Sequence, residues 1–411
     1  MLLGQGANFF LQALYFILLA RLLGVTEYGV FAGAFALVSI VTPYTKLGSN
    51  MLFMRYVSRD RALAPVYLGN ALLCTTFLSL LIAVVFYFVG PSITSLRSHF
   101  IFVLLVLSNC LMSQIAAIGA TVFQTFEKMR LTAMLNLLSN LTRLLILIGL
   151  WLTMHHANAL QWSYAVLAAS TFAAALSLLW VRKEVGGIEF DLKLLRIRLS
   201  EGFWFSFAGS TQSLYNDVDK TMLSHYGLTR ENGVYTLAYR IIDFATTPII
   251  AIDSVVLPRF FQLSHSNMPA VPKLAIRSAM AAALIGLGIA GCLTLLAPIV
   301  PRLVGHDFSG VLLALRWLCW IPALRGIHFL AGSALTGSGH QNLRTAAQFV
   351  VAGINLLLNL WWIPAYGWIG AAWSSVASDG LLAIINVMLF LWLWGRMNRQ
   401  GPQLNLEGRA C

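Results

Sequence analysis

Long runs of apolar residues, separated by short breaks rich in charge, proline or glycine, follow one another along nearly the whole chain. A helix needs about 20 apolar residues to cross the hydrocarbon core of a bilayer, and these runs are of that length. The alternating ten-residue segments that are typical of membrane β-strands do not occur. Because backbone polar groups in lipid must be hydrogen-bonded within the protein, the pattern predicts an all-α integral membrane protein.

The breaks divide the chain into twelve candidate transmembrane helices. They cover about residues 5–24, 29–52, 66–90, 99–124, 131–153, 159–181, 202–224, 233–257, 274–299, 309–335, 342–363 and 368–394. The seventh and eighth contain several charges and are the least regular. The predicted domains are an N-terminal six-helix bundle (1–182), a cytoplasmic amphipathic link (183–200), a C-terminal six-helix bundle (201–396) and a cytoplasmic tail (397–411).

Composition and charge support this interpretation. The chain is 59% hydrophobic and only 10% charged, against about 25% charged residues in a soluble domain. With the N-terminus in the cytoplasm, 17 Lys and Arg residues fall on the cytoplasmic side and 4 on the opposite side, as the positive-inside rule requires. Both termini are therefore expected in the cytoplasm. The net charge of +12 then reflects orientation and contact with anionic lipids, not nucleic acid.

Metal and cofactor chemistry is not indicated. The five cysteines have no metal-ligand spacing, and Asp217-Val-Asp219 lies in an apolar helix without the context of a nucleotide-sugar site. We expect no cofactor.

Six basic residues remain inside the predicted spans. They are Lys46, Arg143, Lys220, Arg240, Arg316 and Arg325. Each charge at the centre of a membrane helix costs about 2.5–3.5 kcal/mol, so such residues are expected to face a protein interior or water. Asn140 shares a helix face with Arg143, and Asn355 and Asn359 share a face of the eleventh span. These residues predict a cationic cavity for an anionic substrate.

A plainer explanation stays open for part of this charge. Asp217 and Lys220, and likewise Arg240 and Asp243, are three residues apart and can pair on one helix. Lys46 lies near a span end, where its side chain can reach the interface. The embedded acids Asp219, Asp243 and Asp379 could bind a proton or Na⁺ that drives transport, or they could only pair with nearby basic residues.

The chain also contains an internal echo. Glu27-Tyr-Gly-Val-Phe is matched by Glu231-Asn-Gly-Val-Tyr, 204 positions later. Six predicted spans separate the two copies, and an even number gives both the same direction through the membrane. The repeat is therefore predicted to be parallel, with a pseudo-two-fold axis along the membrane normal.

The first copy lies in Ala-Arg21-Leu-Leu-Gly24-Val-Thr-Glu27-Tyr-Gly29-Val-Phe, which resembles the signature of bacterial polysaccharide flippases. These are O-antigen repeat-unit translocases of the multidrug/oligosaccharidyl-lipid/polysaccharide (MOP) exporter superfamily. Two later segments agree: Gly233-Val-Tyr, with Pro258 closing the eighth span, and Ile363-Pro-Ala-Tyr-Gly-Trp-Ile-Gly-Ala-Ala.

The resemblance implies a transporter of the bacterial inner membrane and not an enzyme. Such a flippase moves an undecaprenyl-diphosphate-linked oligosaccharide from the cytoplasmic to the periplasmic leaflet through a cationic cavity. Its expected partners are this substrate and membrane lipids, together with a polysaccharide polymerase and a chain-length regulator.

Three other functions compete with this interpretation. A flippase for another lipid-linked anion, such as a cell-wall precursor or a teichuronic-type polymer, is compatible with the same charges. A membrane-embedded polymerase or ligase would need a large outer loop, whereas the predicted outer loops are short. A multidrug exporter for lipophilic cations would favour an acidic cavity, against which the six embedded basic residues argue.

Overall fold

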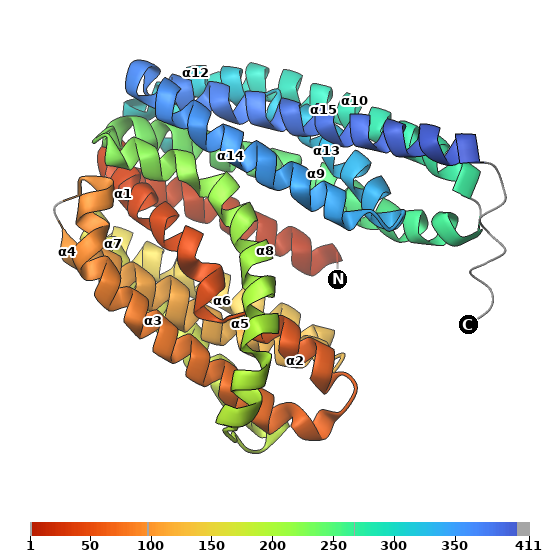
Figure 1. The fold of residues 1–411 in the computed structure, drawn as a ribbon. Coiled ribbons are helices and arrows are strands. Elements are labelled where there is room, and N and C mark those ends of the chain that lie inside the picture. Colours follow the sequence, from red (N-terminus) through yellow and green to blue (C-terminus); the bar gives the residue numbers. More distant parts are fainter. Residues whose placement is uncertain (1, 97, 267, 401–411) are drawn as a thin grey trace. The chain divides into compact units, whose positions relative to one another are not determined.

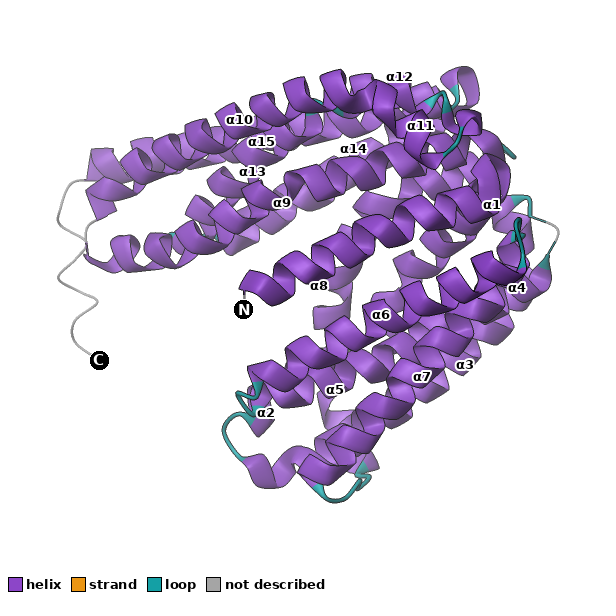
Figure 2. Ribbon diagram, turned by 180° about the vertical axis from the view of Figure 1, so that it is seen from behind, coloured by secondary structure: helices purple, strands orange, loops and turns teal. Residues whose placement is uncertain are grey.

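The chain is built from helices, as Figures 1 and 2 show for a computed structural model that describes residues 2–96, 98–266 and 268–400. No strand occurs in these ranges, which confirms the predicted all-α class. Two compact units can be distinguished, Met1–Thr236 with Pro301–Ser309, and Leu237–Val300 with Gly310–Cys411. Each is described by itself below.

The first unit contains the following elements. They are α1 (Leu2–Thr45), α2 (Ser49–Val57), the short 3₁₀ helix η1 (Arg61–Leu63), α3 (Ala64–Thr94), α4 (His99–Leu105), the π-helical segment η2 (Val106–Met112), α5 (Ser113–Thr125), α6 (Met129–Thr153), α7 (Ala159–Val185), α8 (Leu192–His225), the start of α9 (Thr229–Ser266) and the 3₁₀ helix η5 (His306–Phe308).

The second unit contains the rest of α9 and the elements after it. They are the 3₁₀ helix η3 (Met268–Ala270), α10 (Val271–Leu296), the 3₁₀ helix η4 (Ala297–Ile299), α12 (Val311–Leu318), α13 (Ile321–Gly337), α14 (Gln341–Tyr366) and α15 (Trp368–Gln400). The helix α11 (Val300–Val304) begins at its edge. Residues 401–411 of the predicted tail lie outside the described part of the chain.

The number of spans can be compared with the prediction. Within the described residues, nine helices are long and apolar enough to cross a membrane, and ten if the bent pair His306–Leu318 and Ile321–Gly337 is one span. The predicted first two spans both lie in Leu11–Val57, which counts once. The predicted seventh span lies in α8, which carries Asp217, Asp219 and Lys220 and is absent from the nine. These two differences account for the gap between the twelve predicted spans and the ten candidate spans of the structure.

The first two predicted spans meet at a glycine. Gly24 has φ 70° and ψ 171°, so the helical geometry of α1 is interrupted there. Positive φ is strained for residues with a Cβ atom, and glycine adopts it freely. The break at Gly24 therefore lies where the sequence predicts the first turn between spans.

The expected end of the eighth span is wrong. Pro258 does not close a helix, because α9 continues through Pro248 and Pro258 to Ser266. Proline removes one backbone hydrogen bond, but helices in membrane proteins tolerate it where neighbouring groups satisfy the freed carbonyl.

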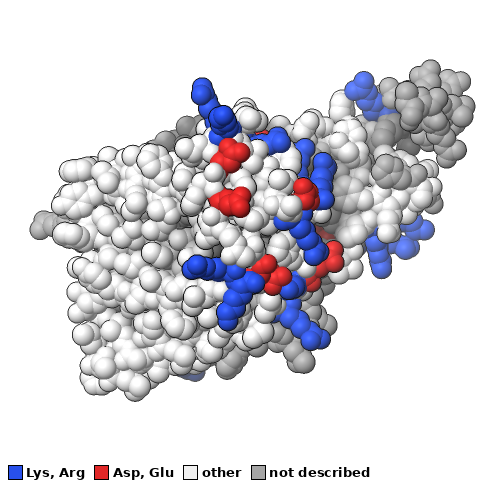
Figure 3. Space-filling view, turned by 90° about the horizontal axis from the view of Figure 1, so that it is seen from below, with Lys and Arg blue, Asp and Glu red and all other residues white. Residues whose placement is uncertain are grey.

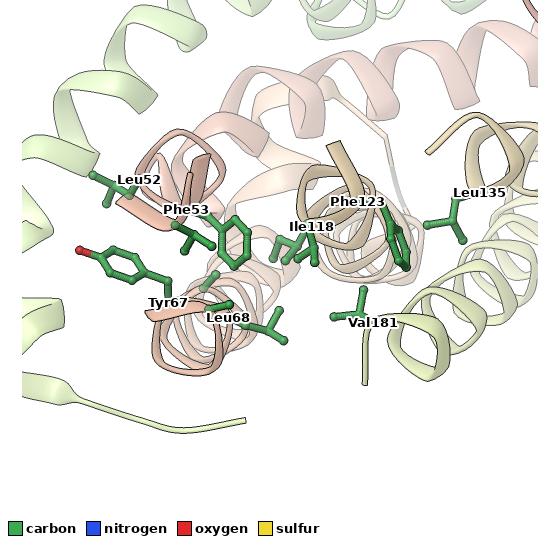
Figure 4. Close-up of a cluster of buried hydrophobic side chains, with 12 residues drawn as sticks. Leu52, Phe53, Tyr67, Leu68, Ile118, Phe123, Leu135 and Val181 are labelled. Carbon is green, nitrogen blue, oxygen red and sulfur yellow. The ribbon is translucent and has the colours of Figure 1, made fainter. Parts of the chain in front are cut away.

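A hydrophobic cluster joins five helices of the first unit (Figure 4). Leu52 and Phe53 come from α2, and Tyr67 of α3, Phe123 of α5 and Val181 of α7 pack with them. Phe53 and Phe123 are each 1% exposed. Close packing of this kind holds helices together in lipid, where burial of apolar surface gives little net driving force.

The predicted link is partly helical, because α8 already begins at Leu192. The Asp191 carboxylate accepts hydrogen bonds from the backbone N–H groups of Lys193 and Leu194, both at 2.9 Å, which caps the helix start. The Asn70 side chain donates to the Asp191 carbonyl at 3.0 Å and accepts from its N–H at 3.1 Å. The start of α8 is therefore held against α3. The predicted division of the chain into two six-helix bundles stays a prediction.

Charge is unevenly distributed on the face drawn in Figure 3. Lys, Arg, Asp and Glu side chains gather on one part of it, and a broad area beside them carries none. Large apolar side chains are exposed elsewhere on the helices, among them Phe77 at 65%, Leu152 at 73% and Trp361 at 76%. Such exposure is expected of surfaces that face lipid rather than water.

The two echoed motifs contact each other through their glycines. A Cβ atom on Gly29 would lie 1.8 Å from the Thr229 carbonyl oxygen, and one on Gly233 would lie 2.0 Å from the Val25 carbonyl oxygen. Gly233 and Thr229 are the positions that match Gly29 and Val25 in the repeat. The contact is thus reciprocal, as in a local two-fold pairing of like segments.

Candidate functional site

A polar chain crosses the first unit from α1 to the π-helical segment η2. The Lys46 Nζ donates to Gln114 Oε1 at 3.1 Å, and Gln114 Nε2 donates to the Asn109 carbonyl at 3.2 Å. The Asn109 amide donates to the Thr42 hydroxyl at 3.0 Å, and that hydroxyl donates to the Val38 carbonyl at 2.8 Å. Single turns of π-helix are frequent at functional sites.

A second cation, on α6, contacts the residue that precedes Gln114. The Arg143 Nη2 donates to the Ser113 hydroxyl at 3.0 Å. Ser113 and Gln114, the partners of Arg143 and Lys46, are the first two residues of α5. Two predicted cavity residues thus contact neighbouring residues at the helix start that follows η2. Both cations are half-buried.

The partners of Lys46 and Arg143 are neutral. In the described ranges of the chain, neither residue forms an ion pair with a carboxylate. A hydroxyl and an amide oxygen can orient a cation, but they do not cancel its charge. No carboxylate of the described residues therefore offsets a charge on either side chain. Asn140, one turn before Arg143 on α6, is half-buried and makes further contacts.

Lys220 is bound within its own helix. It is 4% exposed, and its Nζ pairs with Asp217 at 2.8 Å and donates to the Asn216 carbonyl at 2.5 Å. The local pairing that the spacing allowed is confirmed.

Asp219 lies one residue before Lys220 and is 2% exposed. It accepts hydrogen bonds from the Tyr235 hydroxyl and from the Lys220 backbone N–H. Asn232 donates to the backbone carbonyls of Lys220 and Gly29 at 3.0 and 3.2 Å. This polar group therefore ties α8, α9 and α1 together, close to the glycine contact.

Arg325 is held by acids in the second unit. Its Nη1 lies 2.9 Å from Asp243 Oδ1, its Nη2 donates to the Tyr239 hydroxyl at 2.8 Å, and its Nε lies 3.5 Å from Asp379 Oδ2. The guanidinium also lies over the Tyr239 ring, 5.4 Å from its centroid. The predicted cavity residue Arg325 is thus neutralised by two of the three predicted coupling acids.

Arg240 and Arg316 are placed differently. Arg240 lies one turn before Asp243 on α9, is half-buried and makes further contacts. Arg316 is exposed on α12. Neither is brought to Lys46 and Arg143 by the packing within its unit.

Asn355 and Asn359 join α14 to α15. The Asn355 amide donates to the Ser378 hydroxyl at 3.0 Å, the Asn359 amide donates to Asn355 Oδ1 at 3.0 Å, and the Ser374 hydroxyl donates to Asn359 Oδ1. Both asparagines are buried, at 2% and 0% exposure. Their amides are used for helix packing, a common role of such residues in membranes.

The sequence prediction missed three contributors to these groups. Ser113 and Gln114 hold the two cations of the first unit, and His328 lies beside Asp379 in the second. The signal was present in each case, as a polar pair inside the fourth apolar run and a histidine three residues after Arg325.

The chain is similar to one protein family in sequence and to several membrane transporters in fold. The model of a family described as "Polysaccharide biosynthesis protein" matches residues 1–264. An inward-facing multidrug resistance MATE family transporter of the MOP superfamily has a TM-score of 0.78 at 13% identity, over 95% of this chain and 96% of that chain. The lipid II flippase MurJ has a TM-score of 0.78 at 16% identity, over 94% and 87%.

A MOP superfamily transporter from Pyrococcus furiosus is also similar, with a TM-score of 0.63 at 15% identity, over 96% of this chain and 92% of that chain. Among curated proteins, no sequence matches the chain. At these identities the solved structures establish the fold alone, and the family membership of the chain rests on the match to the family model.

Proposed function

Because the chain belongs to the polysaccharide biosynthesis protein family, we propose that it is a flippase which moves an undecaprenyl-diphosphate-linked oligosaccharide across the bacterial inner membrane. Transport runs from the cytoplasmic to the periplasmic leaflet by alternating access. The observation that carries this proposal is the pair Lys46 and Arg143, whose hydrogen-bond partners Gln114 and Ser113 are neutral.

A diphosphate is the ligand that suits this pair. Arg143 can donate two parallel hydrogen bonds to phosphate oxygens, and Lys46 adds a compact point charge. Two charges retained inside a membrane protein without a carboxylate partner cost several kcal/mol unless an anion or water meets them. The diphosphate supplies that anion, while the lipid tail remains in the bilayer.

The same pair favours an anionic substrate over one of the rival functions. A lipophilic cation would be repelled by Lys46 and Arg143, which argues against a multidrug exporter despite the similarity to a MATE family transporter. Another lipid-linked anion remains the second candidate. MurJ, a similar fold at 16% identity, is described as a lipid II flippase, which supports a lipid-linked substrate as a class.

The proposal is tested by binding of undecaprenyl diphosphate to the purified full-length protein in nanodiscs. Hydrogen bonds to charged groups contribute about 1.5–3 kcal/mol, and about 1.4 kcal/mol is a tenfold change in affinity. Lys46→Met and Arg143→Met should therefore each weaken binding about tenfold or more. Arg59→Ala, an exposed residue after α2, is the matched loss of one positive charge and should leave the affinity unchanged.

Uncharged undecaprenol serves as the ligand control, and its binding should be the same in all variants. Parental affinity of the Lys46→Met/Arg143→Met double variant for the diphosphate would overturn the assignment.

A further inference from the structure

The second unit contains a buried histidine beside a buried carboxylate. His328 on α13 is 6% exposed and Asp379 on α15 is 0% exposed. The His328 Nε2 lies 3.4 Å from Asp379 Oδ1, and Arg325 Nε lies 3.5 Å from Asp379 Oδ2. Two basic side chains on one helix thus face the same carboxylate. All of these residues lie in the second unit, whereas Lys46 and Arg143 lie in the first.

Arg325 contacts the Asp243 carboxylate more closely than the Asp379 carboxylate. Charge-assisted hydrogen bonds between a cationic N–H and a carboxylate are about 2.7–2.9 Å long. The contacts of Arg325 with Asp243 and Tyr239 have this length, at 2.9 and 2.8 Å. Its contact with Asp379 is 0.6 Å longer than that with Asp243, since 3.5 Å compares with 2.9 Å. Arg325 is therefore anchored to α9, and its attraction to Asp379 is the weaker of the two.

The histidine has capacity left for a proton. Its Nε2 is buried and makes no well-aligned hydrogen bond with a described residue, although it lies 3.4 Å from Asp379 Oδ1. A neutral imidazole carries a proton on one of its two ring nitrogens, and the other can accept one. An imidazolium that donates to a carboxylate forms a charge-assisted hydrogen bond, which the present spacing would reach by a shift of about half an ångström.

We propose that His328 and Asp379 form a proton-binding site, and that Arg325 and the proton compete for Asp379. A proton from water adds to the pair as Arg325 withdraws fully to Asp243 and Tyr239. The proton supplies the positive charge beside Asp379 that the guanidinium no longer provides. On release of the proton, Arg325 returns.

The remaining charged groups around His328 keep their partners in this exchange. On α14, Arg344 donates to the Thr336 hydroxyl at 3.1 Å and acts electrostatically on His328. On α9, Asp253 accepts a hydrogen bond from Ser333 at 2.6 Å and acts in the opposite sense. The basic residues of α10, Lys273 and Arg277, are exposed near its start. Arg344 and Asp253 therefore act on His328 with opposite sign, and Arg325 is the member of this set that also contacts Asp379.

Proton binding by this pair stands on its own geometry, and only its use to drive transport rests on the proposed flippase function. A proton that displaces Arg325 from Asp379 changes the contacts between α13 and α15. It is thus able to bias two packings of these helices against each other.

The test follows the imidazole of His328 by NMR in the full-length, substrate-free protein, labelled with ¹⁵N-histidine and held in nanodiscs. The chain has 8 histidines, and the signal of His328 is the one that disappears in His328→Gln. The parent ring should pass from the neutral to the charged form as the pH is lowered over the range in which the protein stays folded. His306→Gln, at an exposed position of η5, should remove a different signal and leave this titration unchanged.

Two variants at the neighbouring groups should move the titration in opposite directions. Asp379→Asn removes the anion and should lower the proton affinity of His328 about tenfold or more, whereas Arg325→Gln removes the competing cation and should raise it by a similar factor. Arg325→Lys keeps the charge and should raise it less. A merely structural role predicts no opposite shifts.

A His328 ring that stays neutral throughout this range and is insensitive to both substitutions would refute the proposal. So would a response of its signal to Na⁺ at constant pH with none to protons. Either outcome leaves the binding of undecaprenyl diphosphate by Lys46 and Arg143 untouched. Conversely, loss of that binding would leave the titration in place.

Discussion

The reciprocal glycine contact between the two echoed motifs gives a sharp prediction for stability. Replacing Gly29 by alanine places a Cβ atom 1.8 Å from the Thr229 carbonyl oxygen, where ordinary contact begins at about 3.4 Å. The two backbones must therefore separate by about 1.6 Å, the difference between these distances. Overpacking of this kind costs about 1–3 kcal/mol. Gly233→Ala should cost a similar amount, because its Cβ atom would meet the Val25 carbonyl oxygen at 2.0 Å.

The double variant makes the argument specific to this contact. Once the first Cβ atom has separated the segments, the second meets less resistance, so Gly29→Ala with Gly233→Ala should cost less than the sum of the two single changes. Thermal unfolding of the purified full-length protein in detergent measures all three. Gly149→Ala, inside α6 with no atom within 4 Å of its Cβ position, is the matched control and should be neutral or stabilising. Single variants as stable as the parent, or strictly additive costs, would refute the close pairing.

Two further predictions concern the ion pair of α8 and the topology. Asp217→Asn removes the carboxylate that pairs with the buried Lys220 ammonium and should cost about 3–5 kcal/mol, whereas the double variant with Lys220→Met should recover most of the folded yield, which size-exclusion chromatography measures. A single cysteine at Phe190, an exposed link residue, in an otherwise cysteine-free protein should react with an impermeant thiol reagent only after the cells are opened; labelling in intact cells would contradict the cytoplasmic link.

The helical architecture and the embedded charges could be predicted from sequence because both depend on local information. A run of about 20 apolar residues already predicts a span. The pairing of Asp217 with Lys220, three residues apart, needed no knowledge of tertiary structure and is confirmed at 2.8 Å. The turn at Gly24 was likewise indicated by the residues around it.

The cross-helix partners could not be predicted in this way. The spacing allowed Asp243 to pair with Arg240 on its own helix, but nothing in it indicated the ion pair of Asp243 with Arg325, which is 82 positions away. Lys46 similarly reaches Gln114 over 68 positions. Such contacts depend on how each helix is rotated about its axis and on where a π-helical turn shifts the register of a face. Periodicity within one helix contains no information about either.

Asn355 and Asn359 show that a polar helix face can be predicted from sequence although its role cannot. Their common helix face was identified correctly, but a polar face can line a cavity or join two helices, and the sequence does not distinguish the two. The structure brings them against Ser374 and Ser378 of α15, so their amides are satisfied within the protein.

Transport by the reconstituted full-length protein tests the central claim most directly. Proteoliposomes would contain a fluorescent oligosaccharide linked to undecaprenyl diphosphate, and an impermeant quencher would report how much of it changes leaflet. We expect the parent and the Arg59→Ala control to flip this lipid at the same rate, and the Lys46→Met/Arg143→Met variant to be inactive although it is folded. A parent that does not move the lipid, or a double variant that moves it at the parental rate, would contradict the account.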